Sequence, residues 1–189
     1  MKNITHQFSG KSLLELREKF GTGSSGFWDN TWWLKEDWAK EKPEVGVYGL
    51  DLSDELVDLT FDEQKKKLKK GFEVAHPAII AEAILTHFKE TGERLCENYW
   101  VRTSSIPSAY AGCVSCVGNF DENGLDVGRW GGYRRSSLGV GASRKLRSLK
   151  PRKIEPLDSL SLEKRVERIE KWIEFWETVE TPWKIKGDE

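Results

Sequence analysis

The residues most able to do chemistry in this 189-residue chain are three cysteines and three histidines. Cys113 and Cys116 form a C-x-x-C pair inside the uncharged segment "SSIPSAYAGCVSCVG", residues 104–118. A pair with this spacing can serve a redox or metal centre. Here the pair falls within an apparent strand, without the strand-to-helix context of a redox motif, and no histidine is near enough to complete a zinc pattern. We therefore expect free thiols, no cofactor and no metal.

Other catalytic patterns are absent from the sequence. There is no nucleophile elbow, phosphate loop or H-E-x-x-H motif. His6 and His76 have no serine, cysteine or carboxylate at a spacing that indicates catalysis, and His87, alone near the end of a predicted helix, is more typical of a structural residue. The sequence thus favours a protein that is not an enzyme. The enzymatic alternative is a reactive thiol at Cys113 or Cys116, for which no general base is visible.

Charge and hydropathy exclude two classes of partner. The 30 Lys and Arg residues nearly balance the 31 Asp and Glu residues, so the chain lacks the basic field that drives binding to nucleic acid. No apolar run is long enough for a membrane span, and the N-terminus lacks the apolar core of a signal peptide. We expect a soluble protein, cytoplasmic or carried on a virion, without nucleic acid as a partner.

Helix-capping signals predict three helices in the first half of the chain. Ser12 with Glu15, and Thr60 with Glu63, have the spacing of capping boxes. The segment 77–92 has proline at its start, glycine at its end and an amphipathic pattern between them. The second helix carries five lysines, which we interpret as a solvated face, and we expect it to end at Gly71.

Residues 1–44 contain a dense group of aromatic side chains. Because tryptophan buries a large apolar area, we expect this segment to pack onto the body of the protein. Carbohydrate stacking is the alternative interpretation. The aromatic residues in question are Phe27, Trp28, Trp32, Trp33 and Trp38.

Short β-like segments dominate the second half. Residues 45–52 read as one strand, and from residue 98 onward short strands alternate with Gly, Ser and Asn, which is typical of hairpins with a turn at Asn123-Gly124. Residues 157–182 have the 3.6-residue periodicity of an amphipathic helix that docks on the body or on a second copy. The sequence therefore predicts one α+β domain over residues 1–189.

Two windows of the second half lack five residue types. Between residues 101 and 121, and again between 131 and 144, there is no Lys, Glu, Gln, Met or Trp. Random replacement of the adenines in an asparagine codon yields Ser, Gly, Tyr, Arg, Cys, Ala, Ile, Pro and Val, among others, but never those five. The strings "IPSAYAGCVSC" and "GGYRRSS" match that output.

The block "YWVRTSS…VGNFDENGLDVGRWGGYRRSSLGVGASRK", residues 99–145, resembles the variable region of C-type-lectin-fold proteins diversified by bacterial and archaeal retroelements. It is more loosely similar to the lectin-like domain of the formylglycine-generating family. The resemblance implies a single C-type-lectin-like α+β domain with short antiparallel strands, two to three packed helices and the C-terminal amphipathic helix. It also implies that residues 98–148 form a ligand-binding region, with a protein as the usual ligand.

Carried over to this chain, the resemblance implies two kinds of position in the region. Displayed positions carry variable side chains that contact the ligand, and frame positions carry fixed side chains that hold the fold. The displayed set is Ile106, Ser108, Ala109, Tyr110, Cys113, Ser115, Arg129, Gly131, Gly132, Tyr133, Arg134, Arg135 and Ser136. The frame set is Trp100, Val114, Val117, Phe120, Leu125, Val127, Leu138 and Val140.

Tyr, Arg, Ser and Gly are the residue types that selected binding loops favour. The triplets that bind calcium in sugar-binding lectins are missing, since the chain has "EPL" at 155 and "WGG" at 130. The alternative is a phage or cell-surface receptor-binding module with a fixed surface.

Overall fold

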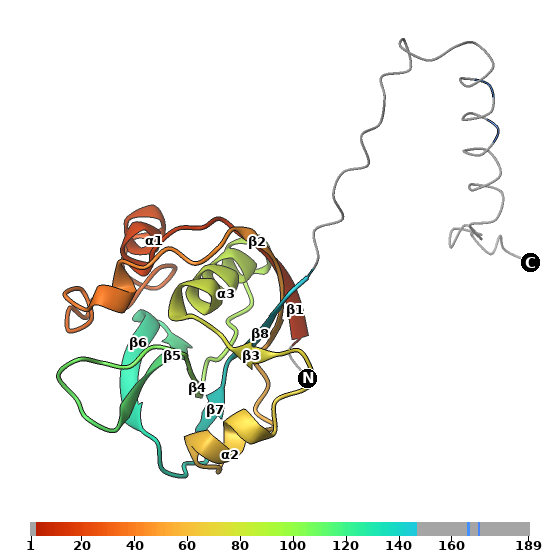
Figure 1. Ribbon diagram of the computed structural model, residues 1–189. Helices are drawn as coiled ribbons and strands as arrows, with labels where there is room; N and C mark the ends of the chain where they lie inside the picture. The colour runs from red at the N-terminus through yellow and green to blue at the C-terminus, as the bar shows by residue number, and fades with distance from the viewer. Residues whose placement is uncertain (1–2, 147–165, 167–169, 171–189) are drawn as a thin grey trace, which may run out of the picture. The chain divides into compact units, whose positions relative to one another are not determined.

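The computed structural model describes residues 3–146 and, beyond them, only Val166 and Glu170 (Figure 1). The chain divides into two units, residues 1–148 and 149–189. The helix expected over residues 157–182 lies outside the described residues, apart from Val166 and Glu170.

The first unit is an α+β fold, as predicted. Its strands are β1 (Asn3–Phe8), β2 (Gly46–Asp51), β3 (Glu73–Val74), β4 (Trp100–Arg102), β5 (Cys113–Asp121), β6 (Gly124–Gly131), β7 (Leu138–Val140) and β8 (Ala142–Lys145). Its helices are α1 (Leu13–Phe20), α2 (Phe61–Lys66) and α3 (Pro77–Thr91), with a short 3-10 helix at Asp37–Ala39.

The strands form two four-stranded sheets. The first has the order β1-β2-β8-β3, with antiparallel pairing throughout. The second has the order β6-β5-β4-β7, in which only the β4–β7 pair is parallel. The tight hairpin of β5 and β6 turns at residues 122–123, between the paired Asp121 and Gly124, one residue before the predicted turn.

The capping chemistry determines where the helices begin. Both predicted capping boxes are present, with Ser12 at the start of α1 and Thr60 at the start of α2. Gly92 ends α3 in the left-handed conformation, which glycine adopts without strain. Helix α2 ends at Lys66, well before Gly71, so the prediction of its C-terminus was wrong.

Helix α3 is the central element of the core. Every residue from Pro77 to Leu85 is buried, although the sequence pattern indicated an amphipathic helix. The helix packs against α1, β1 and β5 (Figure 1). These neighbours also cover the side of the helix that the amphipathic pattern predicted to face solvent. Strand β1, which no pattern in the sequence predicted, is one of these neighbours.

The aromatic segment after α1 packs onto the body. Phe27 and Trp33 are completely buried and Trp38 is nearly so. The indole N–H of Trp32 donates to the Val127 carbonyl at 2.7 Å. Trp28 is 43% exposed, and its backbone N–H bonds to the Leu125 carbonyl. The segment therefore covers the outer edge of β6.

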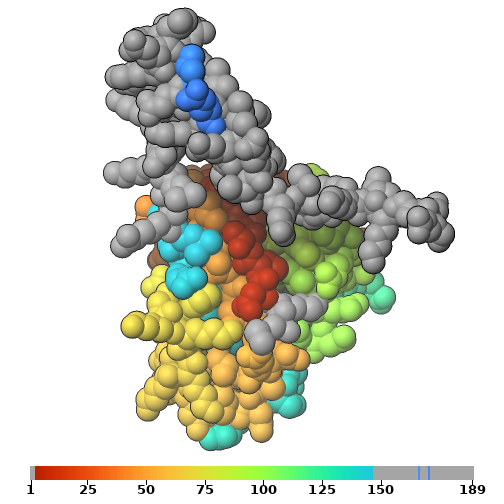
Figure 2. Space-filling model, turned by 90° about the vertical axis from the view of Figure 1, so that its right-hand side faces the viewer, coloured from red at the N-terminus to blue at the C-terminus, as the bar shows by residue number. Residues whose placement is uncertain are grey.

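Strand β8 is an inner strand that reaches the surface at its end. Figure 2 shows the cyan end of β8 beside the yellow segment that contains α2 and the residues after it. There the Arg144 guanidinium lies 5.2 Å from the centre of the Phe72 ring. No helix in the described part of the chain is long and apolar enough to span a membrane.

Candidate ligand-binding surface

The predicted displayed residues gather at one end of the second sheet. Cys113 pairs with Gly131, and Ser115 with Arg129, so the open end of the β5–β6 hairpin carries all four. The other displayed residues lie in the loop 103–112, between β4 and β5, or in the loop 132–137, between β6 and β7. The two loops meet where the Gly132 N–H donates to the Gly112 carbonyl at 3.3 Å.

The displayed set differs widely in exposure. Ile106 is 67% exposed, Tyr133 57% and Tyr110 39%. The positions that are exposed are Ile106, Ser108, Ala109, Tyr110, Tyr133, Arg134, Arg135 and Ser136, and those of intermediate exposure are Cys113, Arg129, Gly131 and Gly132.

Ser115 corrects the predicted set, because it is completely buried. Strand β5 lies between β4 and β6, and at this position the Ser115 hydroxyl contacts the hydroxyl of Thr103. A ligand therefore has no access to Ser115. Seven of the eight predicted frame residues are buried, and they are Val114, Val117, Phe120, Leu125, Val127, Leu138 and Val140.

A buried arginine holds the loop 132–137 from behind. Arg102, on β4, is completely buried and donates through Nη2 to the carbonyls of Gly131, at 3.0 Å, and Tyr133. Through Nη1 it donates to Gln64 Oε1 at 2.7 Å and to the Leu59 carbonyl at 3.2 Å. Burial lowers the pKa of the Arg102 guanidinium. Within residues 3–146 its hydrogen-bond partners are these neutral oxygens and no carboxylate.

Further backbone contacts fix the same loop. The N–H groups of Phe61 and Asp58 each donate at 2.9 Å, to the carbonyls of Gly132 and Arg135 respectively. The Trp100 N–H donates to the Ser137 carbonyl at the same distance. These contacts do not depend on which side chains the loop carries.

The loop 103–112 is also held through its backbone. Its N–H group at Ser108 donates to Glu36 Oε2 at 2.9 Å, and the Ser104 N–H donates to the Ala75 carbonyl at 3.0 Å. Glu36 is nearly buried and also accepts from the Ser108 hydroxyl, at 3.1 Å, and from the Trp38 indole, at 3.1 Å. The aromatic segment therefore positions this loop.

Two arginines at the surface stack on aromatic rings. The Arg129 guanidinium carbon lies 3.6 Å from the centre of the Tyr110 ring and 4.8 Å from that of Trp32. The Arg135 guanidinium carbon lies 4.0 Å from the centre of the Trp130 ring. Arg129 and Trp130 are adjacent in a strand, so the two stacks lie on opposite faces of the sheet end. Stacking of this kind restricts the guanidinium and keeps its N–H groups free for a ligand.

A hollow of about 490 Å³ lies beside the loop 103–112. Its lining includes Trp38, Glu41, His76, Ile106 and Ser108. The His76 Nδ1 accepts from the Ala78 N–H, while its Nε2 lies 3.3 Å from a Glu41 carboxylate oxygen. The polar lining and open shape suit a contact with another surface.

Cys113 and Cys116 are not joined by a disulfide. Cys113 and Cys116 are three positions apart in β5, so their side chains point to opposite faces of the sheet. Cys116 is completely buried, and burial raises its thiol pKa well above the ordinary value. The thiol of Cys116 is therefore protonated and shielded at neutral pH. Within the described residues, no group of three or more His, Cys, Asp or Glu side chains is placed to hold a metal ion.

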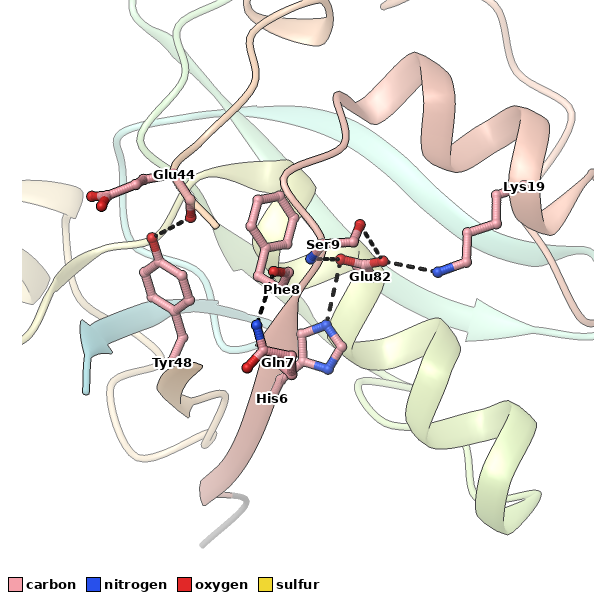
Figure 3. A network of polar contacts seen from close by, with 8 residues as sticks. All are labelled: His6, Gln7, Phe8, Ser9, Lys19, Glu44, Tyr48 and Glu82. Carbon is pink, nitrogen blue, oxygen red and sulfur yellow. Dashed lines mark hydrogen bonds and ion pairs between the residues drawn. The ribbon is translucent and has the colours of Figure 1, made fainter. Parts of the chain in front are cut away.

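Two buried carboxyl groups lie away from the displayed loops. Burial raises the pKa of Asp126 to about 7, against the hydrogen bonds from Asn30 and the Val127 backbone. Burial also raises the pKa of Glu82, but hydrogen bonds outweigh it and lower the pKa to about 2. Figure 3 shows the network around Glu82, which accepts from Lys19 Nζ at 2.9 Å and from the Ser9 hydroxyl at 2.8 Å. His6 Nε2 is 3.6 Å from this carboxylate, too far for a strong hydrogen bond.

The residues that support the surface carry few signals in the sequence. Arg102 is part of the family motif, and Gln64 is one of the residues that the pattern of the second helix predicts to face inward, as it does. No pattern marks Glu36. A polar residue in a strand or loop gives no local signal that it is buried. Trp32 was expected to pack, but its place beneath Arg129 depends on contacts about 100 residues apart in the chain.

Comparison of the chain with protein-family models, with curated proteins and with solved structures finds no significant match.

Proposed function

We propose that the chain is a non-enzymatic ligand-binding protein, whose region 98–148 presents side chains diversified by a retroelement on a C-type-lectin-like domain. The observation that carries the proposal is the way the two loops are held. Arg102 and the N–H groups of Asp58, Phe61 and Trp100 contact backbone carbonyls of the loop 132–137 and its flanks. Side chains can change on such a loop without removing its supports.

The two loops also have the composition of a selected binding surface. Tyr110 and Tyr133 offer broad rings, and the arginines offer forked donors, at one end of a sheet whose interior is fully packed. A protein is the ligand class that such a surface suits, because it combines exposed apolar and cationic groups.

The DNA beside the gene tests the diversification. We expect a near-copy of the segment that encodes residues 98–148, differing from it only where the copy has adenine, together with a reverse transcriptase gene. Sequencing of the flanking DNA provides the measurement. A locus without such a repeat would contradict diversification and leave a fixed binding surface.

The fixed-surface alternative rests on one contact. Arg129, Tyr110 and Trp32 stack as a specific set, and random replacement of the first two would remove the stack from most copies. A receptor-binding module whose surface is not diversified would keep this stack in every copy. The same sequencing experiment separates the two candidates.

Tolerance of the loops to substitution can be measured directly. One library carries random codons at Ile106, Ala109, Tyr133 and Ser136, and a matched library carries random codons at the buried Val101, Val117, Phe120 and Leu138. Both libraries are displayed on the surface of yeast cells and treated with a protease. We expect most members of the first library, and few of the second, to resist cleavage. Equal losses in the two libraries would count against a display role for the loops.

A further inference from the structure

Two cations of the surface have no carboxylate partner within residues 3–146. Arg129 and Arg135 form no ion pair there, whereas Arg134 pairs with Glu63. An aromatic ring attracts a guanidinium through its quadrupole but does not neutralise the charge. The surface thus keeps two uncompensated positive charges, one on each face of the sheet end.

The stacks also orient these two side chains. Arg129 contacts the rings of both Tyr110 and Trp32, which meet edge to face, and Trp32 is itself fixed by its bond to the Val127 carbonyl. Arg135 rests on Trp130, which contacts Trp100 edge to face with ring centres 6.4 Å apart. A guanidinium that is already oriented loses little entropy when it binds a carboxylate through two parallel hydrogen bonds.

The surroundings favour discrete carboxylates over a continuous polyanion. Exposed acidic side chains lie beside both loops, with Asp37 and Glu41 near the loop 103–112 and Asp58 and Asp62 near the loop 132–137. A nucleic acid carries closely spaced charges and would meet these carboxylates as well as the arginines. Ile106 and Tyr133 add exposed apolar area, which suits a folded or peptide partner.

We infer that the partner is a protein whose contact face carries aspartate or glutamate side chains, and that Arg129 and Arg135 bind them. This inference rests on the proposed function and specifies the chemistry of its ligand. Arg129 would anchor one side of the sheet end and Arg135 the other, with Ile106, Tyr110 and Tyr133 in apolar contact around them.

Panning the full-length chain against a phage library of random dodecapeptides tests the inference. We expect the peptides enriched on the wild-type protein to contain Asp and Glu at two or more times their frequency in the library. Synthetic copies should bind about tenfold more weakly to Arg129→Gln and to Arg135→Gln, because charge-assisted bonds at an interface are lost. The matched control is Arg144→Gln, which removes an exposed arginine that also lies over an aromatic ring, Phe72, but on β8 and outside both loops. This variant should bind the peptides as the wild type does.

Arg129→Lys shows whether folding accounts for a loss. This variant keeps the positive charge but loses the two parallel N–H donors of the guanidinium. We therefore expect an affinity for the peptides between those of the wild type and Arg129→Gln, with an unchanged melting curve. Enriched peptides that lack an acidic bias, or that bind both glutamine variants as tightly as the wild type, would overturn this inference but leave the proposed function standing. No enrichment at all would count against both.

A fluorescein-labelled 20-nucleotide single strand of DNA tests the polyanion alternative. We expect its affinity at 150 mM salt to be far below that of the enriched peptides. DNA that binds as tightly as the peptides, and loses its binding in both glutamine variants, would overturn the choice of an acidic protein.

Discussion

Arg102 and Glu82 are both buried and ionised, but the protein surrounds them in different ways. Glu82 accepts from the ammonium of Lys19 on α1 and from both the hydroxyl and the backbone N–H of Ser9, which directly follows β1 (Figure 3). Backbone carbonyls and a glutamine amide oxygen meet Arg102. The first arrangement requires particular residues at its partner positions. The second fixes the path of a loop and leaves most of its side chains unconstrained.

Among the charged and exposed groups, removal of the Arg102 guanidinium should give the largest effect on stability. Arg102→Met leaves the carbonyls of Leu59, Gly131 and Tyr133 without their donor, and we expect a loss of about 3 kcal/mol in the free energy of unfolding. Urea denaturation measures this loss, and amide hydrogen exchange should show faster exchange across residues 131–137. The control Arg134→Met removes an exposed pair and should change stability by less than about 1 kcal/mol. Similar losses of stability in the two variants would contradict the role of Arg102 in holding the loop 132–137.

Asp126 should make stability fall as the pH rises. Its folded-state pKa, about 7, is above its ordinary value of 3.8, so the folded state binds the proton more tightly than the unfolded state does. The stability that this proton contributes is complete below pH 4 and is lost as the pH rises through 7. Asp126→Asn cannot ionise, and we expect it to stabilise the fold by about 1–3 kcal/mol at pH 8 and little at pH 4. Thermal melts at the two pH values provide the check; an equal shift at both would disprove the assignment.

Glu82 should show the opposite dependence. Its pKa is depressed to about 2, so its contribution is present above pH 4.5 and is lost as the pH falls toward 2. Glu82→Gln removes the charge that Lys19 meets, and we expect a loss of about 1–2 kcal/mol at pH 7. The difference from the wild type should vanish near pH 2, as measured by denaturation across this range. A loss that stays constant with pH would indicate a packing effect.

The smallest effect should come from the displayed loops. We expect Ile106→Ala combined with Tyr133→Ala to change the free energy of unfolding by no more than about 0.5 kcal/mol, because both side chains are more than half exposed. Phe120→Ala, on the same sheet but completely buried, should lose about 3–5 kcal/mol. A comparison of melting temperatures distinguishes the pair. If the melting temperature of the loop variant is as low as that of the core variant, these loop side chains stabilise the fold and are not displayed for a ligand.

The parts of the fold that depend on local chemistry were predictable from the sequence. Both capping boxes and the β5–β6 hairpin are set by residues a few positions apart, and each is present close to where it was predicted. The burial of α3 on all sides was not predictable, because it depends on strands that pair across most of the chain. Ser115 was misplaced for the same reason, since a serine in a central strand has the same residue type as one in a loop.

The position of β8 has a consequence for how the protein folds. This strand lies between β2 and β3, and its Lys145 pairs with Tyr48. During synthesis the first sheet has a gap at its centre until residues 142–145 have left the ribosome. Contacts of such long range slow the search for the native state and leave two unpaired strand edges open in the meantime. We therefore expect folding to be completed only after residues 103–112 and 132–137 have been made.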